Sequence, residues 1–270
     1  MPQFAIEVSK VNKNFYKERS LKEVILNPLN GRSFKYIMHR PLSKIESPII
    51  ALKNVSFKIP KGELWCLIGS NGSGKTTLIK ILTTLIISDS GKAHVNNYDV
   101  KKEEQQVRNS IGLIYNEERS FFWRLTGRQN LEFFAALYGL KRKDIRKRID
   151  YVLDIVGLKD KADIRFDSYS TGMKRKMSIA RGLLNEPDII LADEPTNGLD
   201  PVAAKHIIDF LRNELVKKRG KTILMASHNL NEVQSICDGI ILLHKGKVKA
   251  SGPLKSGSKL LEIFEKMTGD

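Results

Sequence analysis

The stretch that decides the fold is Leu64–Thr76, with the sequence LWCLIGSNGSGKT. Its apolar beginning, Leu64–Ile68, is too short for a helix and is bounded by glycines, which predicts a strand buried on both faces, as in a parallel sheet. The pattern G-x-x-x-x-G-K-[ST] then occupies Gly69–Thr76, and apolar residues at helical spacing follow as far as Ile86. A glycine-rich turn between a buried strand and a helix predicts a phosphate site, and we call Gly69–Thr76 the phosphate loop.

The residue types of the phosphate loop indicate how it would hold a nucleotide. Glycines let consecutive backbone N–H groups curl around a β-phosphate, and the positive end of the following helix faces the same anion. We expect Lys75 to reach the β- and γ-phosphates and the hydroxyl of Thr76 to ligate Mg²⁺. The nucleotide-binding residues predicted here are Ser70, Asn71, Gly72, Ser73, Gly74, Lys75, Thr76 and Thr77.

Two adjacent acids, Asp193 and Glu194, follow a second apolar run, Ile189–Ala192. Ligands of open α/β sheets collect at the carboxyl ends of strands, where these acids lie. We expect Asp193 to hold Mg²⁺, through water, and Glu194 to polarise the attacking water as a general base. Adjacent acids are usually a strand-end cap or surface charge, but a phosphate loop in the same chain favours the catalytic interpretation.

Further periodic segments predict an α/β fold with a largely parallel sheet. The other predicted strands are Phe4–Val11, Val55–Ile59, Ile111–Tyr115 and Thr222–Ala226, and the later predicted helices are Asn130–Leu140, Ile145–Val156 and Met173–Leu184. Three consecutive helical stretches predict a helical subdomain, about residues 117–185, inserted between core strands. We expect one folding unit over residues 1–270, because internal repeats are absent.

The composition is that of a globular protein, since 41% of the 270 residues are hydrophobic, and this excludes a disordered or fibrous chain. The 46 Lys+Arg against 30 Asp+Glu give a net charge of +16. Such a charge fits nucleic acid, anionic lipid, a phosphate-rich ligand or a solvated face, and no direct nucleic-acid partner is expected because aromatic residues are not interleaved in the later basic clusters. No apolar stretch is long enough to span a bilayer, so a membrane role is expected through a partner.

The two cysteines, Cys66 and Cys237, lie far apart and without CxxC spacing. They predict neither a disulfide framework nor a zinc site. We expect each to pack in the core, in a reducing compartment.

Three further segments carry a resemblance to a known family. YSTGM at Tyr169–Met173 looks like a degenerate form of the signature LSGGQ, and it precedes the two acids as it does in that family. NGLD at Asn197–Asp200 resembles the D-loop, and Ser227–His228 resembles the switch histidine segment. With the phosphate loop and the acids, these motifs resemble the nucleotide-binding subunit of ATP-binding cassette (ABC) transporters from about Phe4 to Gly252.

The resemblance implies a P-loop NTPase core with a mostly parallel sheet, an antiparallel β subdomain and an inserted helical subdomain. It implies ATP as substrate, Mg²⁺ as cofactor, and two cassettes that face each other head to tail, so that ATP lies between one phosphate loop and the opposite signature. The partner cassette would be a second copy or a sister chain. Glu194 and His228 are the implied catalytic residues, Asp200 belongs to the D-loop, and the residues implied to meet the opposite subunit's ATP are Ser170, Thr171, Gly172 and Met173.

Two family positions stay open. The Q-loop glutamine falls on Asn116 when aligned from the left, and on Glu117 or Glu118 when aligned from the right. Asn116 would contact the nucleotide and ligate Mg²⁺ through its carbonyl oxygen. The aromatic residue that stacks on adenine falls on Phe15 or Tyr16, and the spacing favours Phe15.

Residues 120–140 resemble type-2 (ABC-2) exporters, and segment 17–50 looks like an insertion of polysaccharide exporters. We therefore expect an ATPase subunit, peripheral at the cytoplasmic face of a membrane, that powers export through separate transmembrane permease subunits. The alternatives are a soluble cassette ATPase acting on nucleic acid or ribosomes, and a regulatory cassette that hydrolyses weakly. The aromatic run Phe121–Trp123 predicts a permease contact or subdomain core equally, and a terminal helix is expected over about residues 253–270.

Overall fold

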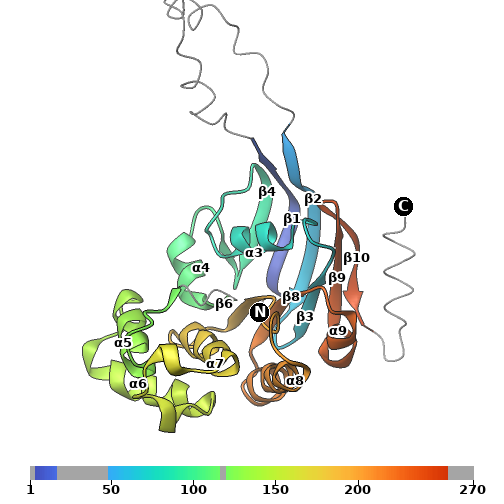
Figure 1. Ribbon diagram of the computed structural model, residues 1–270. Helices are drawn as coiled ribbons and strands as arrows, with labels where there is room; N and C mark the ends of the chain where they lie inside the picture. Colours follow the sequence, from blue (N-terminus) through green and yellow to red (C-terminus); the bar gives the residue numbers. More distant parts are fainter. Residues whose placement is uncertain (1–3, 17–47, 116–119, 255–270) are drawn as a thin grey trace, which may run out of the picture.

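The computed structural model describes residues 4–16, 48–115 and 120–254. Its strands form two sheets, with the order β2-β1-β4-β5 in the smaller and β10-β9-β3-β8-β7-β6 in the larger (Figure 1). The strands are β1 (Phe4–Phe15), β2 (Ile49–Pro60), β3 (Leu64–Ile68), β4 (Ser90–Val95), β5 (Tyr98–Asp99), β6 (Ile111–Tyr115), β7 (Ile189–Asp193), β8 (Thr222–Ser227), β9 (Gly239–His244) and β10 (Lys247–Pro253).

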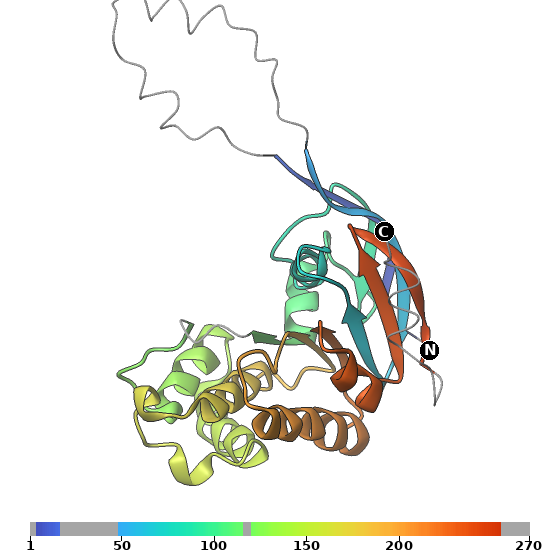
Figure 2. The same ribbon diagram turned by 45° about the vertical axis from the view of Figure 1, so that its right-hand side comes forward.

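The helices lie on both sides of the larger sheet. Figures 1 and 2 show α5 to α8 on the side of this sheet that faces away from β1, β2 and β4. The helices are α3 (Lys75–Leu82), α4 (Glu104–Ser110), α5 (Gly127–Leu137), α6 (Arg142–Ile155), α7 (Thr171–Gly182), α8 (Pro201–Asp209), which continues as a π-helical segment, η4 (Phe210–Lys218), and α9 (Leu230–Ile236), with short 3₁₀ turns η2 (Lys159–Lys161) and η3 (Phe166–Ser168).

The strand β3 is buried on both faces, as its apolar run predicts. It pairs in parallel with β8 on one side and β9 on the other. Leu64, Cys66 and Ile68 belong to the core under α5 to α9, whereas Trp65 and Leu67 belong to the core shared with the smaller sheet. The α/β class with a mostly parallel sheet and an antiparallel subdomain is therefore confirmed.

Helix α3 lies between the two sheets and ends earlier than its periodicity predicts. Four of its side chains, Leu78, Ile79, Ile81 and Leu82, are fully buried in the core between the sheets. The helix stops at Leu82, and Thr84 takes a left-handed conformation with φ 62°. The apolar residues that follow are not a continuation of the helix, since the side chain of Leu85 is 60% exposed.

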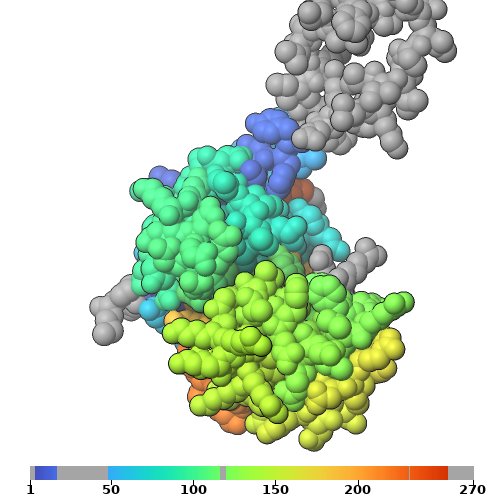
Figure 3. Space-filling view, turned by 90° about the vertical axis from the view of Figure 1, so that its left-hand side faces the viewer, coloured from blue at the N-terminus to red at the C-terminus, as the bar shows by residue number. Residues whose placement is uncertain are grey.

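The helical subdomain consists of α5, α6 and α7, and these match the three predicted helices within a few residues. Thr126 caps α5 by a capping box with Gln129, which explains why this helix starts earlier than the apolar pattern indicates. In Figure 3 this subdomain forms a lobe below the segment that contains β4 and α4. The aromatic run at its start is only partly in the subdomain core: Phe121 is buried against Phe134 and Phe166, whereas Phe122 and Trp123 are each 47% exposed.

The prediction of two unlinked cysteines is wrong. Cys66 and Cys237 form a disulfide with their Cα atoms 6.1 Å apart, although both do lie at the core beneath α5 to α9. The pairing depends on topology, because α9 packs on β3 and Cys237 directly follows α9, although it is 171 residues away from Cys66 in sequence. Sequence spacing holds no signal for such a contact.

Several expectations fall outside the described residues. They are the greater part of the insertion, residues 17–47 of the predicted 17–50, the Q-loop segment 116–119, and the terminal helix beyond Leu254. Across the described ranges, no helix combines the length and the apolar character needed to cross a bilayer.

The loop before β9 is fixed by a bidentate ion pair. The guanidinium of Arg212 donates to both carboxylate oxygens of Asp238 at 2.5 and 2.7 Å, and Asp238 also accepts from the backbone N–H of Leu64 at 2.9 Å. Burial by itself raises the pKa of Asp238, but these hydrogen bonds outweigh it and hold the pKa below its usual value. The ionised carboxylate therefore stabilises the start of β3.

We predict that Asp238→Asn lowers the free energy of unfolding at pH 7 by about 2 kcal/mol, because Arg212 loses its charged acceptor. Because the pKa of Asp238 is lower in the folded state than in the unfolded state, its charge adds to the free energy of unfolding. This contribution is complete above the unfolded-state pKa of about 3.9 and is lost as the pH falls through the folded-state pKa. The difference between wild type and variant should therefore shrink at pH 3. Urea unfolding at pH 7 and at pH 3 measures this difference in the free energy of unfolding, and the surface change Asp144→Asn is the control. A difference that does not depend on pH would contradict the assignment.

Candidate nucleotide site

The candidate site lies where three neighbouring parallel strands end. Ile68 of β3 is opposite Ser227 of β8, and Asp193 of β7 is opposite Ala226 of β8. The residues that follow these strands therefore emerge at one edge of the sheet. They are the phosphate loop, Glu194 and His228, and the structure thus brings together groups that are far apart in sequence.

The phosphate loop has a backbone that only glycine fits at Gly74. Gly74 has φ 107°, and a Cβ atom there would lie 2.6 Å from the carbonyl oxygen of Ala51. Gly72 also has positive φ, 79°, with open space around it. Ser73 is only 2% exposed, and its hydroxyl has no hydrogen-bond partner within the part of the chain that the structure describes. A phosphate oxygen fits these features, because the loop offers a buried donor and backbone N–H groups without side-chain obstruction.

Lys75 is the buried cation of the site. Its ammonium donates to the carbonyl oxygens of Gly69 at 2.8 Å and of Ser70 at 3.3 Å, and it lies 3.7 Å from the carboxylate of Glu194. The side chain is 6% exposed. The ammonium therefore lies between the loop and the carboxylate, where it can exchange a carbonyl partner for a phosphate oxygen.

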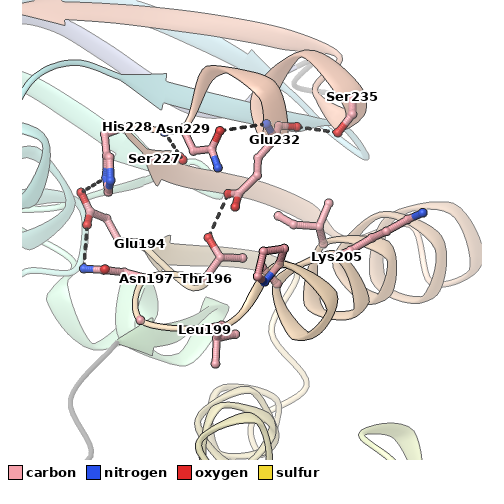
Figure 4. A pocket seen from close by; sticks show the side chains of 14 residues that line it. Glu194, Thr196, Asn197, Leu199, Lys205, Ser227, His228, Asn229, Glu232 and Ser235 are labelled. Carbon is pink, nitrogen blue, oxygen red and sulfur yellow. Dashed lines mark hydrogen bonds and ion pairs between the residues drawn. The ribbon is translucent and has the colours of Figure 1, made fainter.

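Glu194 is held in an unusual backbone conformation at the end of β7. Its φ is 49°, in the left-handed region, and its N–H donates to the carbonyl of Ala226 at 3.0 Å. One carboxylate oxygen lies 3.2 Å from Nδ1 of His228, and the other accepts from the amide of Asn197 at 3.2 Å (Figure 4). Strained non-glycine residues of this kind cluster at functional sites. The carboxylate is oriented from two sides toward the loop.

The next carboxylate, Asp193, faces the first turn of α3. Burial raises its pKa, and the charge of Glu194 adds to this effect, while a hydrogen bond with Thr76 acts in the opposite direction. A carboxylate beside a threonine hydroxyl offers oxygen ligands of the kind that Mg²⁺ takes, and a divalent cation would relieve the electrostatic cost. No cluster of three or more His, Cys, Asp or Glu within the described ranges could hold a metal. The fit is therefore to Mg²⁺ held partly by phosphate and water oxygens.

The signature segment starts α7. Ser170 is the N-cap, and its hydroxyl accepts from the backbone N–H of Met173 at 3.2 Å. Thr171 is exposed, and a Cβ atom on Gly172 would meet only the Ser170 hydroxyl, at 4.0 Å. Among the described residues, no hydrogen bond or ion pair joins Ser170–Met173 to the phosphate loop. The helix therefore presents an accessible, positively polarised end that makes no such contact with its own loop.

The other predicted residues have less specific surroundings. Asp200 caps α8 by accepting from the backbone N–H groups of Val202 and Ala203, which is a structural role within this chain. Phe15 ends β1 and is 38% exposed, with the ammonium of Lys13 5.5 Å from its ring centre. Thr77 lies half-buried in α3, whereas Asn116 lies outside the described residues.

The structure also adds residues that the sequence did not assign to the site. A cavity of about 460 Å³ beside Glu194 is lined by Thr196, Asn197 and Glu232, among others, and Glu232 accepts from the Thr196 hydroxyl at 2.9 Å (Figure 4). Arg175 of α7 donates to the carbonyl oxygen of Asn197 at 2.9 Å. The D-loop resemblance could have singled out Asn197, but nothing in sequence spacing indicates the Arg175 contact.

Fold and site together define an ATPase of the P-loop class, with a phosphate loop, an acidic pair and a histidine on adjoining strand ends. Residues 52–197 match the family described as ABC transporter, and the chain belongs to that family. The predicted resemblance to nucleotide-binding subunits of ABC exporters is confirmed by relatives of that kind, and a solved cassette in a post-hydrolysis state supports ATP hydrolysis.

Among curated relatives, the chain is 38% identical over 206 residues to the ABC transporter ATP-binding protein NatA of Bacillus subtilis. The aligned residues cover 76% of this chain and 83% of NatA. It is 39% identical over 204 residues to the doxorubicin resistance ATP-binding protein DrrA of Mycobacterium tuberculosis, covering 76% of this chain and 61% of DrrA. It is 33% identical over 254 residues to a Nod factor export ATP-binding protein I of Neorhizobium galegae, covering 92% of this chain and 72% of that protein.

Solved cassettes share the fold. CbiO1 from Clostridium perfringens, part of the transporter complex cbiONQ, superposes with a TM-score of 0.74 at 26% identity, over 93% of this chain and 89% of cbiO1. The ATP-binding cassette MJ0796, in a dimeric post-hydrolysis state bound to ADP and Pi, superposes with a TM-score of 0.73 at 27% identity, over 93% of this chain and 99% of that chain.

We predict opposite effects of Asp193→Asn on stability and on nucleotide binding. Because burial raises the pKa of Asp193, its charge at pH 7 costs stability, and its removal should raise the free energy of unfolding by about 1 kcal/mol without ligand. Wild type should gain about 2.7 kcal/mol from Mg²⁺-ATP at one hundred times its dissociation constant, and the variant much less at the same concentration. Urea unfolding with and without Mg²⁺-ATP measures both effects. Equal stabilisation of the two proteins by Mg²⁺-ATP would contradict the magnesium site.

Proposed function

We propose that the chain binds Mg²⁺-ATP at the phosphate loop and hydrolyses it to power export through separate membrane subunits. The observation that carries this proposal is the convergence of Lys75, Glu194 and His228 at one edge of the parallel sheet. Lys75 and the loop amides would hold the β- and γ-phosphates, with Thr77 as a further contact and Phe15 against the adenine. Mg²⁺, held by Thr76 and Asp193 and in the proposal also by Asn116, would neutralise charge on the phosphate oxygens.

Glu194 is proposed as the general base. Its carboxylate lies next to the cation that would hold the γ-phosphate, and it is only 21% exposed, so a water held there would be polarised in the line of attack. His228 lies 3.2 Å from the same carboxylate and extends toward the site (Figure 4). This position lets its ring contact the γ-phosphate while Glu194 takes the proton of the water. A regulatory cassette that hydrolyses weakly would have no use for this pairing.

A single chain would supply only part of each site. The end of α7 that carries Ser170 and Gly172 is open and faces no phosphate of its own chain. In a head-to-tail dimer, its N–H groups and the Ser170 hydroxyl would meet the γ-phosphate held by the opposite phosphate loop, with Thr171 and Met173 beside them. Loss of the γ-phosphate by hydrolysis would then weaken the dimer, which gives a cycle of closing and opening.

An aromatic patch on the helical subdomain is the proposed contact for the permease subunit. Phe122 and Phe133 pack edge to face with ring centres 4.8 Å apart, and both are more than 40% exposed. Leu137 next to them is 66% exposed. Apolar exposure of this kind marks interaction sites, and these residues lie on the subdomain that also carries α7. This favours a permease over ribosomes or nucleic acid as partner.

The net charge of +16 supports a peripheral position at the cytoplasmic face of the membrane. Anionic headgroups of the inner leaflet attract basic residues over about a Debye length. The chain would thus sit below its permease with its basic residues near the lipid surface.

We predict that Glu194→Gln lowers the ATP turnover number by about a hundredfold or more, because an amide cannot take the proton of the attacking water. ATP affinity should change little, since Lys75 and the loop remain. Steady-state phosphate release and equilibrium binding of a fluorescent ATP analogue measure the two quantities. The surface change Glu104→Gln is the matched control, and a turnover number equal to that of wild type would refute the assignment of the base.

Mixed dimers test the shared site. Lys75→Ala and Gly172→Asp should each abolish hydrolysis alone, but a heterodimer of the two variants contains one site with an intact loop and an intact signature. An equal mixture should therefore recover about a quarter of the wild-type rate if subunits exchange freely and sites act independently. Phosphate release before and after mixing measures the recovery. No recovery in a mixture shown to contain heterodimers would contradict the head-to-tail arrangement.

A further inference from the structure

A chain of hydrogen bonds leads from the signature helix to the catalytic carboxylate. Arg175 lies in the first turns of α7, is 6% exposed, and donates to the carbonyl oxygen of Asn197 at 2.9 Å. The side-chain amide of Asn197 donates in turn to Glu194 at 3.2 Å. Two hydrogen bonds therefore separate the helix that carries the signature from the proposed base.

The segment that receives Arg175 is an exposed turn. Asn197 and Gly198 are exposed, Gly198 has φ 80°, and nothing lies within 4 Å of the place where its Cβ atom would be. On the side of α9, Thr196 is held by Glu232 at 2.9 Å, and the backbone N–H of Asn197 closes a turn on the carbonyl of Glu194 at 3.1 Å. The guanidinium of Arg175 is charged and buried, so its hydrogen bond to the Asn197 carbonyl is of the strong, charge-assisted kind.

The two carboxylate oxygens of Glu194 have different partners, and the amide of Asn197 holds one of them. One oxygen of the carboxylate faces Nδ1 of His228 at 3.2 Å and the ammonium of Lys75 at 3.7 Å, and the other faces only Asn197 among the described residues. Figure 4 shows Asn197 and His228 approaching Glu194 from opposite sides. Without the amide, this oxygen would lose its partner among the described residues, and Lys75 would draw the carboxylate away from the place proposed for the water.

We propose that Arg175 is a positioning residue for hydrolysis: it fixes the backbone of Asn197 so that the Asn197 amide holds Glu194 in its reactive orientation. This inference rests on the proposed function. Because Arg175 belongs to the helix whose first residues, Ser170–Gly172, would grip the ATP of the opposite loop, it couples engagement of that ATP to the base that acts on the chain's own ATP. The two sites of a dimer would in this way communicate through α7.

The test compares turnover and affinity in Arg175→Ala, Asn197→Ala and the double variant, using the full-length chain. We expect each single change to lower kcat about tenfold, with the dissociation constant for an ATP analogue within about twofold of wild type, because phosphate contacts are untouched and only alignment is lost. The double variant should be no slower than either single variant, since the two residues act in one path. Arg175→Lys should recover part of the rate, because it keeps a charged donor.

Lys176→Ala is the matched control, one residue further along the same helix, and should leave kcat unchanged. The positioning role is refuted if Arg175→Ala hydrolyses ATP as fast as wild type and the control. It is also refuted if the losses in kcat of Arg175→Ala and Asn197→Ala multiply in the double variant. In both cases the proposed function stands. If wild type itself binds ATP but does not hydrolyse it, the proposed function fails first. Should Arg175→Ala not fold, the exposed Asn197→Ala decides alone: an unchanged kcat refutes the inference, and a tenfold loss at constant affinity supports it.

Discussion

The constraint on which the site depends is the register of three parallel strands. Because β8 lies between β3 and β7, their carboxyl ends share one edge of the sheet. Lys75 and His228 are thereby each placed within ion-pair or hydrogen-bond distance of Glu194, although more than a hundred residues separate Lys75 from Glu194. The left-handed turn at Glu194 is local strain that accompanies this convergence, whereas Gly74 adopts its positive φ without such strain.

The same register leaves the site open on one side. The phosphate loop would hold the anion, but among the described residues no hydrogen bond or ion pair joins this loop to the positive end of α7, which belongs to the helical subdomain. In the proposed head-to-tail pair, with a second copy or a sister cassette, each subunit would contribute to both sites. In the proposed pair, Arg175 would couple the two sites, because its hydrogen bond to Asn197 joins the signature helix to the segment that holds Glu194.

Motifs whose chemistry is local could be predicted from the sequence, whereas tertiary contacts could not. The bounds of β3 and the positions of the phosphate loop and the acidic pair follow from short runs such as Leu64–Thr76, because strand burial and turn geometry are properties of neighbouring residues. The early end of α3 was missed, since apolar residues continue past Leu82 while the backbone turns at Thr84. The pairing of Cys66 with Cys237 and the contact of Arg175 with Asn197 depend on how distant elements pack, which no spacing encodes.

The central claim is that one chain cannot complete a site for hydrolysis. The most direct test is the ATPase rate per chain, measured at saturating Mg²⁺-ATP over a wide range of protein concentration. If two chains must close on each ATP, the rate per chain rises with concentration in the dilute range and levels off once dimers predominate. A rate per chain that stays constant down to concentrations at which sedimentation shows only monomers would contradict the account.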